Sequence, residues 1–265
     1  MNDKSFTLPD SLSYAEVESI NHWTDHLFSF RVSRPSTFRF RSGEFVMLGL
    51  PVAGKPLLRA YSVASPFWDD ALDFYSIKIM DGPLTSRLQH IQPGDKIILG
   101  KKPTGTLVLD ALKPGKRLFL FSTGTGIAPF ASLIRDPETY EKYNQVILTH
   151  TCRNISELDY GKQVVTSLDD DPLLSDTIQG RLTYFSSTTR EQYSQMGRIT
   201  SLLSTGEFFR RLEIENLEPE NDRAMICGSL AMIKDTSKIL DTAGLREGAN
   251  SNPKEFVIEK AFAGQ

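Results

Sequence analysis

A glycine-rich turn with the sequence TGTGIAP, residues 123–129, directly follows the apolar run 117–122. Glycines let a backbone approach a diphosphate closely, and the free N–H groups at the start of a helix attract anions. Pro129 stands where the dinucleotide fingerprint has its third glycine, and proline suits the first turn of a helix. The pattern favours a nucleotide site over a tight turn without a ligand.

Arginines follow the next apolar runs. Arg153 comes after residues 145–151, where an NAD site has an acidic residue for the ribose 2′-hydroxyl. Thr189 and Arg190 follow residues 181–187, and Arg198 comes soon after. A guanidinium binds phosphate bidentately, and a hydroxyl adds a neutral donor. Any one of these arginines alone is typical of a solvated surface, but together they predict a 2′-phosphate and hence NADP.

A third pattern is Arg59-Ala60-Tyr61-Ser62. A cation, an aromatic ring and a hydroxyl can bind a phosphate, a flat ring and a ring nitrogen, although a half-buried strand gives the same pattern. In a strand, Arg59 and Tyr61 point to one face and Ser62 to the other, unless the strand ends there.

Two further groups lie near the C-terminus. Cys227 and Gly228 end an apolar run at 223–227, where a ligand would sit, although cysteine is also a common buried hydrophobe. Glu259 is followed by Ala261 and Phe262 in a tail that leaves a strand. Phe262 is either a core residue or a stacking surface.

The composition narrows the function classes. The 265 residues suggest about two domains, and the 40% hydrophobic content is that of globular proteins. A net charge of −3 does not favour nucleic-acid binding, and no run of about 18 apolar residues predicts a membrane span. The start lacks a secretory signal, and two cysteines are too few for an iron–sulfur cluster or a cysteine-rich zinc site. We expect a cytoplasmic protein without a metal site.

Two halves differ in their patterns, which predicts a β domain followed by an α/β domain. Residues 1–112 are interpreted as a six-stranded antiparallel barrel with one helix, since Leu84, Leu88 and Ile91 share a helical face. The expected strands are 27–32, 44–50, 57–65, 72–80, 96–99 and 106–109. Residues 113–265 alternate between strands and helices, which predicts a parallel sheet that binds a nucleotide at the carboxyl ends of its strands.

The order of these motifs resembles the ferredoxin–NADP(H) reductase family. RAYS in a barrel, GPLTS opening a helix, GTGIAP after the first α/β strand, the arginines, CGS and a short aromatic tail all fall in that order, from about residue 14 to the end. The tail after Glu259 is similar to the bacterial subclass with a C-terminal extension.

The resemblance implies FAD held mainly by the barrel. Arg59 would bind the diphosphate, Tyr61 would stack on the isoalloxazine, and Ser62 would reach N5. The other implied FAD contacts are Ala60, Tyr75, Ser76, Ile77, Leu84, Thr85, Ser86, Thr123, Ala261 and Phe262. The tail 259–265 would return to the flavin, with Ala261 covering the face where the nicotinamide lands. Plastid members end in Tyr at this place. Because Ala261 is smaller, we expect it to cover the nicotinamide face of the flavin less completely.

The resemblance also implies the NADP(H) contacts: Gly124, Thr125, Gly126, Arg153, Thr189, Arg190, Arg198, Cys227 and Gly228. Cys227 and Glu259 would line the nicotinamide pocket. The residues implied to be catalytic, by positioning the two rings, are Tyr61, Ser62, Cys227, Glu259 and Ala261.

The implied reaction is hydride transfer between NADPH and FAD, then single-electron transfer to ferredoxin or flavodoxin. The alternatives are a reductase component of an oxygenase, an NADH:flavin reductase and a non-catalytic flavin-binding subunit. We expect a monomer. Residues 26–60, with six basic residues and one acid, are a candidate dock for an acidic carrier, to be tested by charge reversal at Arg34 or Arg41.

Overall fold

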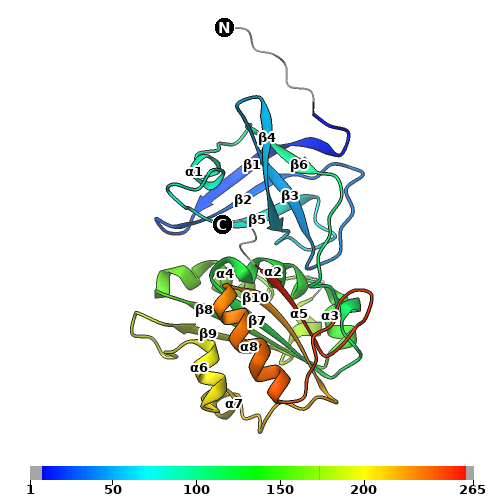
Figure 1. Ribbon diagram of the computed structural model, residues 1–265, viewed down its shortest axis with the longest axis vertical. Helices are drawn as coiled ribbons and strands as arrows, with labels where there is room; N and C mark the ends of the chain where they lie inside the picture. The colour runs from blue at the N-terminus through cyan, green and yellow to red at the C-terminus, as the bar shows by residue number, and fades with distance from the viewer. Residues whose placement is uncertain (1–7, 173, 261–265) are drawn as a thin grey trace.

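The computed structural model describes residues 8–172 and 174–260, which form two domains stacked one above the other (Figure 1). The first domain is an antiparallel sheet of six strands in the order β4-β3-β6-β1-β2-β5. Its strands are β1 (Leu12–His22), β2 (Leu27–Ser33), β3 (Phe45–Val52), β4 (Lys55–Ser62), β5 (Ala71–Ile77) and β6 (Lys96–Gly100).

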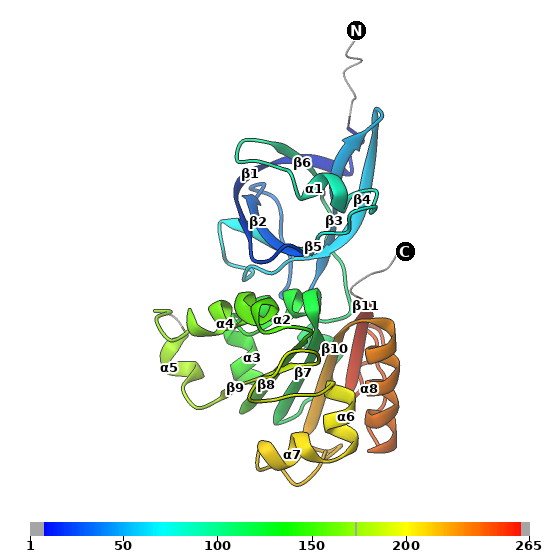
Figure 2. The ribbon, with the colours of Figure 1, turned by 90° about the vertical axis from the view of Figure 1, so that its left-hand side faces the viewer.

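The sheet curls into a barrel around an aromatic and aliphatic core (Figure 2). Phe28, Phe30 and Phe74 are fully or almost fully buried in it. The one helix, α1 (Thr85–Leu88), adds Leu88 to the same core, together with Leu84 and Ile91 on either side of it. The expected helical face is therefore confirmed.

The number of barrel strands is as predicted, but one prediction is wrong. Residues 106–109 are not a strand; they lead into the 3₁₀ turn η1 (Leu109–Ala111). Leu107 and Val108 are buried in the core of the second domain. They are apolar because the segment that connects the two domains packs into this core, and not because it is a strand of the barrel. The sixth strand is instead β1, in which small Ala15 and Val17 face the core between exposed glutamates.

The second domain is a parallel sheet in the order β11-β10-β7-β8-β9. Its strands are β7 (Arg117–Thr123), β8 (Gln145–Cys152), β9 (Leu182–Thr188), β10 (Asp222–Gly228) and β11 (Phe256–Lys260). Buried residues run almost without interruption along β7, β8 and β10, as expected for strands covered on both faces. The predicted fold class is confirmed, while the division after residue 112 stays a prediction.

Helices cover the two faces of this sheet (Figure 2). One face carries η2 (Gly124–Ile127), α2 (Ala128–Leu133), α3 (Pro137–Lys142), η3 (Ile155–Leu158), α4 (Asp159–Thr166) and α5 (Ser175–Ile178). The other carries α6 (Ile199–Ser204), α7 (Glu207–Arg211) and α8 (Leu230–Thr242). Over residues 8–172 and 174–260, no helix is both long and apolar enough to cross a bilayer.

Direct contacts fix one domain against the other. Arg135, just after α2, donates to the Ala64 carbonyl of the barrel, and Trp68 Nε1 donates to the Arg135 carbonyl. The rings of Tyr75 on β5 and Tyr160 on α4 stack with centroids 3.9 Å apart. These contacts hold the edge of the barrel over the carboxyl ends of the parallel strands.

Candidate functional site

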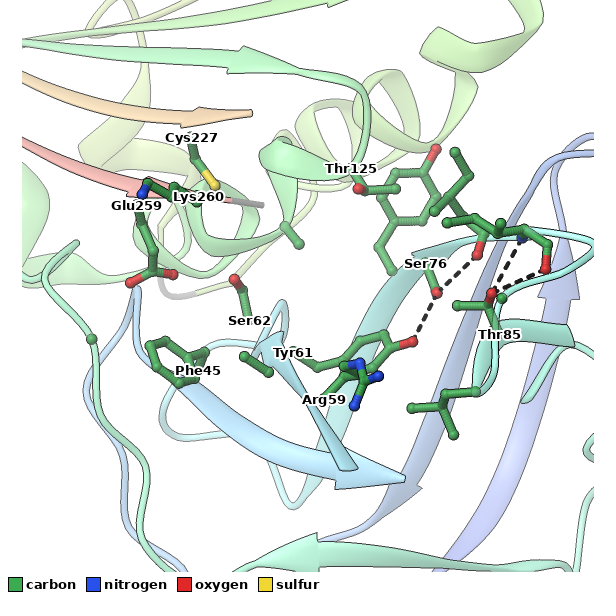
Figure 3. Close-up of a pocket in the computed structure, with 18 of the residues that line it drawn as sticks. Phe45, Arg59, Tyr61, Ser62, Ser76, Thr85, Thr125, Cys227, Glu259 and Lys260 are labelled. Atoms are coloured by element: carbon green, nitrogen blue, oxygen red, sulfur yellow. Dashed lines mark hydrogen bonds between the residues drawn. The ribbon is translucent and has the colours of Figure 1, made fainter. Parts of the chain in front are cut away.

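The sheet order creates a crevice between β7 and β10. The chain leaves β7 toward β8 on one side and later returns to β10 on the other, so the connections diverge at this point. Ligands of open α/β sheets bind outside the strand ends at such a switch point. A cavity of about 880 Å³ lies there, and residues of both domains line it (Figure 3).

The barrel wall of the cavity comes from β4 and β5. Arg59, Ala60, Tyr61 and Ser62 all line it, because β4 is an edge strand that ends at Ser62. The Tyr61 hydroxyl lies 3.3 Å from Ser76 Oγ on β5, so one hydrogen bond joins the two edge strands. Tyr61 packs against the barrel core, which fixes its ring.

The segment around α1 forms the far end of this wall. Leu84 and Thr85 line the cavity. Thr85 Oγ1 accepts from the Ile79 N–H and donates to the Ile79 carbonyl, at 3.3 and 3.2 Å (Figure 3). These bonds tie the helix start to the end of β5.

Glycines make the other wall possible. A Cβ on Gly126 would collide with the Cys227 carbonyl, and one on Gly228 would collide with Thr123 Oγ1. Gly124 has φ +54°, a conformation that side chains disfavour. The turn after β7 can therefore lie directly against the end of β10.

Three side chains converge between the walls: Ser62, Cys227 and Glu259 (Figure 3). Burial raises the pKa of the Glu259 carboxyl to about 7, although hydrogen bonds from the Thr106 N–H and the Ser62 hydroxyl partly oppose the shift. Burial also raises the pKa of Cys227 well above its ordinary value, so it stays a thiol. The site thus holds a carboxyl that exchanges a proton near neutral pH.

Tyr75 and Arg59 are two lining residues whose polar groups lack ionic or hydroxyl partners in the described parts of the chain. The Tyr75 side chain is 4% exposed, yet its hydroxyl has no hydrogen-bond partner among the described residues. Arg59 donates to the Leu58 carbonyl but forms no ion pair with any described residue. An unpaired cation, the aromatic ring of Tyr61 and the size of the cavity fit a large anionic ligand with flat rings, and FAD has these properties.

Not every predicted contact lies on the cavity. Tyr75, Ser76, Ile77, Leu84, Thr85, Thr125 and Cys227 line it with the RAYS residues and Glu259. Ser86, Gly124, Gly126 and Gly228 adjoin lining residues in the chain without lining it themselves, and Thr123 lies one residue farther away. Ala261 and Phe262 lie outside the described residues.

The sequence interpretation missed several lining residues. Phe45 lines the cavity because it pairs with Ser62 across β3 and β4. The RAYS motif alone gives no information about this pairing. Thr104, Gly105 and Thr106 were assigned to a turn and a strand, whereas they form part of the wall. Asn250 belongs to a loop near β11 and had no sequence signal.

The arginines predicted to bind a phosphate lie at the ends of β8 and β9. The Arg190 N–H donates to the Arg153 carbonyl, so the two loops are joined. Two nearby carboxylates accept hydrogen bonds from the backbone: Glu157 accepts from the Arg153 N–H, and Glu191 accepts from the Ile155 N–H. The side chains of Arg153, Arg190 and Arg198 form no ion pair with any described residue.

Comparison with known proteins agrees with this geometry. Residues 12–109 match the oxidoreductase FAD-binding domain, and residues 120–238 match the oxidoreductase NAD-binding domain. A flavodoxin/ferredoxin–NADP reductase of Rhodobacter capsulatus is 60% identical over 97% of this chain and 95% of its own length.

The chain belongs to the ferredoxin–NADP reductase family. A ferredoxin–NADP reductase of Pseudomonas aeruginosa is 49% identical over 93% of this chain and 96% of its own. The crystal structure of a ferredoxin NADP+ reductase from Neisseria gonorrhoeae with bound FAD and NADP superposes with a TM-score of 0.86. It is 30% identical and covers 96% of this chain and 100% of its own.

The predicted family, enzyme class and cofactors are therefore confirmed: the protein is an FAD-dependent oxidoreductase of the ferredoxin–NADP reductase class. The role of each site residue stays a prediction.

The raised pKa of Glu259 predicts a pH-dependent stability. In the unfolded chain this carboxyl ionises near its ordinary value of 4.5, but in the fold only near 7. Between these values the fold binds the proton more tightly, so its free energy of unfolding falls as the pH rises. The loss should reach on the order of 2–3 kcal/mol by pH 8, relative to pH 5. Denaturant unfolding of Glu259→Gln should lack this component.

Glu255→Gln is the matched control. Burial opposes its ionisation, but hydrogen bonds from Lys113 and the Arg246 N–H hold the pKa of Glu255 below its ordinary value. This carboxyl is therefore ionised in both states above pH 5, and its replacement should leave the slope unchanged. Equal slopes for the wild type and Glu259→Gln would contradict the assignment of a raised pKa to Glu259.

Proposed function

We propose that this protein passes electrons between NADPH and a small one-electron carrier, ferredoxin or flavodoxin. One observation carries the proposal: a single cavity joins the flavin-type wall of β4 and β5 to the dinucleotide switch point of β7 and β10. When bound, FAD supplies the redox chemistry, accepting a hydride from NADPH and releasing electrons one at a time. The names of the relatives support this reaction.

The residues of this chain bind and align the two rings. Arg59 neutralises the FAD diphosphate, and Tyr61 offers its fixed ring as a stacking surface. Ser62 lies between this ring and Glu259, where its hydroxyl can donate to a ring nitrogen (Figure 3). Cys227 and Glu259 form the end of the cavity nearest the parallel sheet, which makes them the contacts for the nicotinamide.

An anaerobic titration tests the whole proposal. NADPH should bleach the yellow holoprotein rapidly, and NADH only slowly, because the ribose 2′-hydroxyl of NADH offers no charge to the arginines. Absorbance near the flavin maximum is the measurement. A protein that binds FAD but is bleached by neither nucleotide would favour a non-catalytic binding subunit. If NADPH and NADH bleach the flavin equally fast, the arginines do not bind a 2′-phosphate.

The unpaired arginines should determine the nucleotide preference. A charge-assisted hydrogen bond contributes about 1.5–3 kcal/mol, so Arg190→Ala should lower kcat/KM for NADPH roughly 10–100-fold and leave kcat/KM for NADH nearly unchanged. Arg210→Ala is the control, because this exposed arginine of α7 already pairs with Glu207. If Arg190→Ala lowers kcat/KM for NADPH and for NADH by the same factor, Arg190 does not bind the 2′-phosphate.

The carrier dock needs cations that are free to meet another protein. Four of the six basic residues of the expected dock are engaged within the barrel. Arg31 binds Asp69 and Asp73, and Arg41 binds Glu44. Arg34 donates to the carbonyls of Phe38, Phe67 and Asp69, and Arg39 donates to those of Ser36 and Phe38. They hold loops of the barrel together, so charge reversal at Arg34 or Arg41 would disturb the fold as well as any dock.

A better dock lies on the outer face of β3 and β6. Lys101 and Lys102 follow β6, are exposed, and form no ion pair with a described residue. Met47 on β3 is 39% exposed and lies against Gly100, the residue before these lysines, and the cavity-lining Phe45 is two residues away on the same strand. An apolar centre beside free cations fits an acidic carrier that must approach the flavin.

Charge reversal tests this surface. The double variant Lys101→Glu/Lys102→Glu should slow carrier reduction roughly 3–10-fold at low salt, since opposite charge raises the encounter rate, and salt should reduce the difference. Reduction of ferricyanide by NADPH should not change. Lys96→Glu, at the other end of β6, is the matched control, and an equal effect of that variant would refute the assigned surface.

A further inference from the structure

A buried histidine lies beneath the glycine turn and has no part in the function described so far. His150, on β8, is 0% exposed. Its Nε2 is 3.2 Å from the Gly124 carbonyl oxygen, and its Nδ1 is 3.0 Å from the Tyr184 hydroxyl on β9. A chain of three groups therefore runs from Tyr184 through the imidazole to the first residue of the turn.

The partners decide which nitrogen carries the proton. A carbonyl oxygen only accepts, so Nε2 must bear the hydrogen, and Nδ1 must then accept from the Tyr184 hydroxyl. Burial, with a smaller contribution from nearby Lys162, lowers the pKa of His150 to about 4, although the hydrogen bond to Gly124 partly opposes the shift, so the imidazole is neutral at physiological pH. Cys152 Sγ lies 3.2 Å from the same Nε2 and is a thiol, because burial raises its pKa.

The helix that covers these residues leaves room for them. Gly161 lies inside α4, where glycine is less favourable than alanine. A Cβ at this position would lie 2.6 Å from both His150 Nδ1 and the Tyr184 hydroxyl. Space for this hydrogen bond, and not backbone freedom, accounts for a glycine here.

The other end of the chain controls the turn. Gly124 has φ +54°, and nothing lies within 4 Å of where its Cβ would be, so packing does not hold it. Because the peptide unit is planar and trans, a Gly124 carbonyl directed at His150 points the Thr125 N–H away from it. Thr125 lines the cavity.

We propose that His150, oriented by Tyr184, is a positioning residue that fixes the backbone of residues 124–126 for the diphosphate of NADP(H). The inference rests on the proposed function, which supplies the ligand. It predicts that loss of the relay weakens dinucleotide binding without changing flavin binding, because the hydrogen bonds reach the turn and not the barrel.

Calorimetric titration of the holoprotein with NADP+ tests this. Tyr184→Phe and His150→Leu should raise the Kd about three- to tenfold, the effect of one or two lost hydrogen bonds. His150→Gln, whose amide keeps a donor near the Nε2 position, should restore binding to about twofold of the wild type. Flavin content, and the rate of flavin reduction at saturating NADPH, should stay at the wild-type level.

Tyr140→Phe is the matched control. It removes another buried tyrosine hydroxyl of the same domain, one that donates to the Ile134 carbonyl at 2.8 Å. This variant should lose stability to a similar degree as Tyr184→Phe while keeping the wild-type Kd. An equal rise in Kd for both variants would mean that general loosening of the domain, and not the relay, is responsible.

An NMR measurement tests the relay without a dinucleotide. Long-range ¹H–¹⁵N spectra of the wild type should show a proton on His150 Nε2 and none on Nδ1, unchanged from pH 5.5 to 8. A proton on Nδ1 would overturn the relay. If the wild type binds no NADP+ while the spectra show the expected tautomer, the proposed function fails, and with it the role of His150 in positioning, but the hydrogen-bonded chain stands.

Discussion

The two strand ends at the switch point meet with almost no side chains between them. Gly126 lies against the Cys227 carbonyl, and Gly228 lies against Thr123 Oγ1. Neither position has room for even a methyl side chain. This contact allows the turn after β7 to stay close to the sheet. The position of Cys227 and the depth of the cavity both depend on it. A larger residue would separate the turn from β10 and move Thr125 relative to Glu259.

A second constraint acts between the domains. Electron and hydride transfer need fixed distances, and the alignment of two rings depends on how rigidly their binding walls are joined. Here the joint is made at the site itself: the Thr106 hydroxyl donates to the Ile258 carbonyl at 2.7 Å, beside Glu259. The Tyr75–Tyr160 stack holds the other end of the cavity. The cavity is therefore clamped at both ends.

The sequence predicted those parts of the molecule that depend on local pattern. The alternation of strands and helices in the second half, the turn at 123–129 and the RAYS strand all carry local signals, and the structure places them as expected. Predictions from local sequence pattern were wrong where a residue is buried by a part of the chain that is far away in the sequence. Residues 106–109 are apolar because they pass between two domains, whereas β1 alternates between small core residues and exposed glutamates. Phe45 and Asn250 reach the cavity through long-range pairing, which no short motif reports.

The same limit explains why arginine counts alone do not identify a binding surface. Residues 31–41 contain several arginines, and Arg153, Arg190 and Arg198 follow strands of the second domain. The sequence alone gives no sign of which of these guanidinium groups has a partner within the fold. In the first group, carboxylates of the barrel pair with Arg31 and Arg41, and carbonyls accept the guanidinium hydrogens of Arg34, so fewer donors are left for a partner. In the second group, the neighbouring glutamates accept from backbone N–H groups instead. These carboxylates keep further acceptor sites, but neither forms an ion pair with Arg153, Arg190 or Arg198, so the three guanidinium groups are available for the phosphate that we propose. What distinguishes the two groups is therefore whether the guanidinium itself has a carboxylate or carbonyl partner within the fold, which a count of arginines does not report.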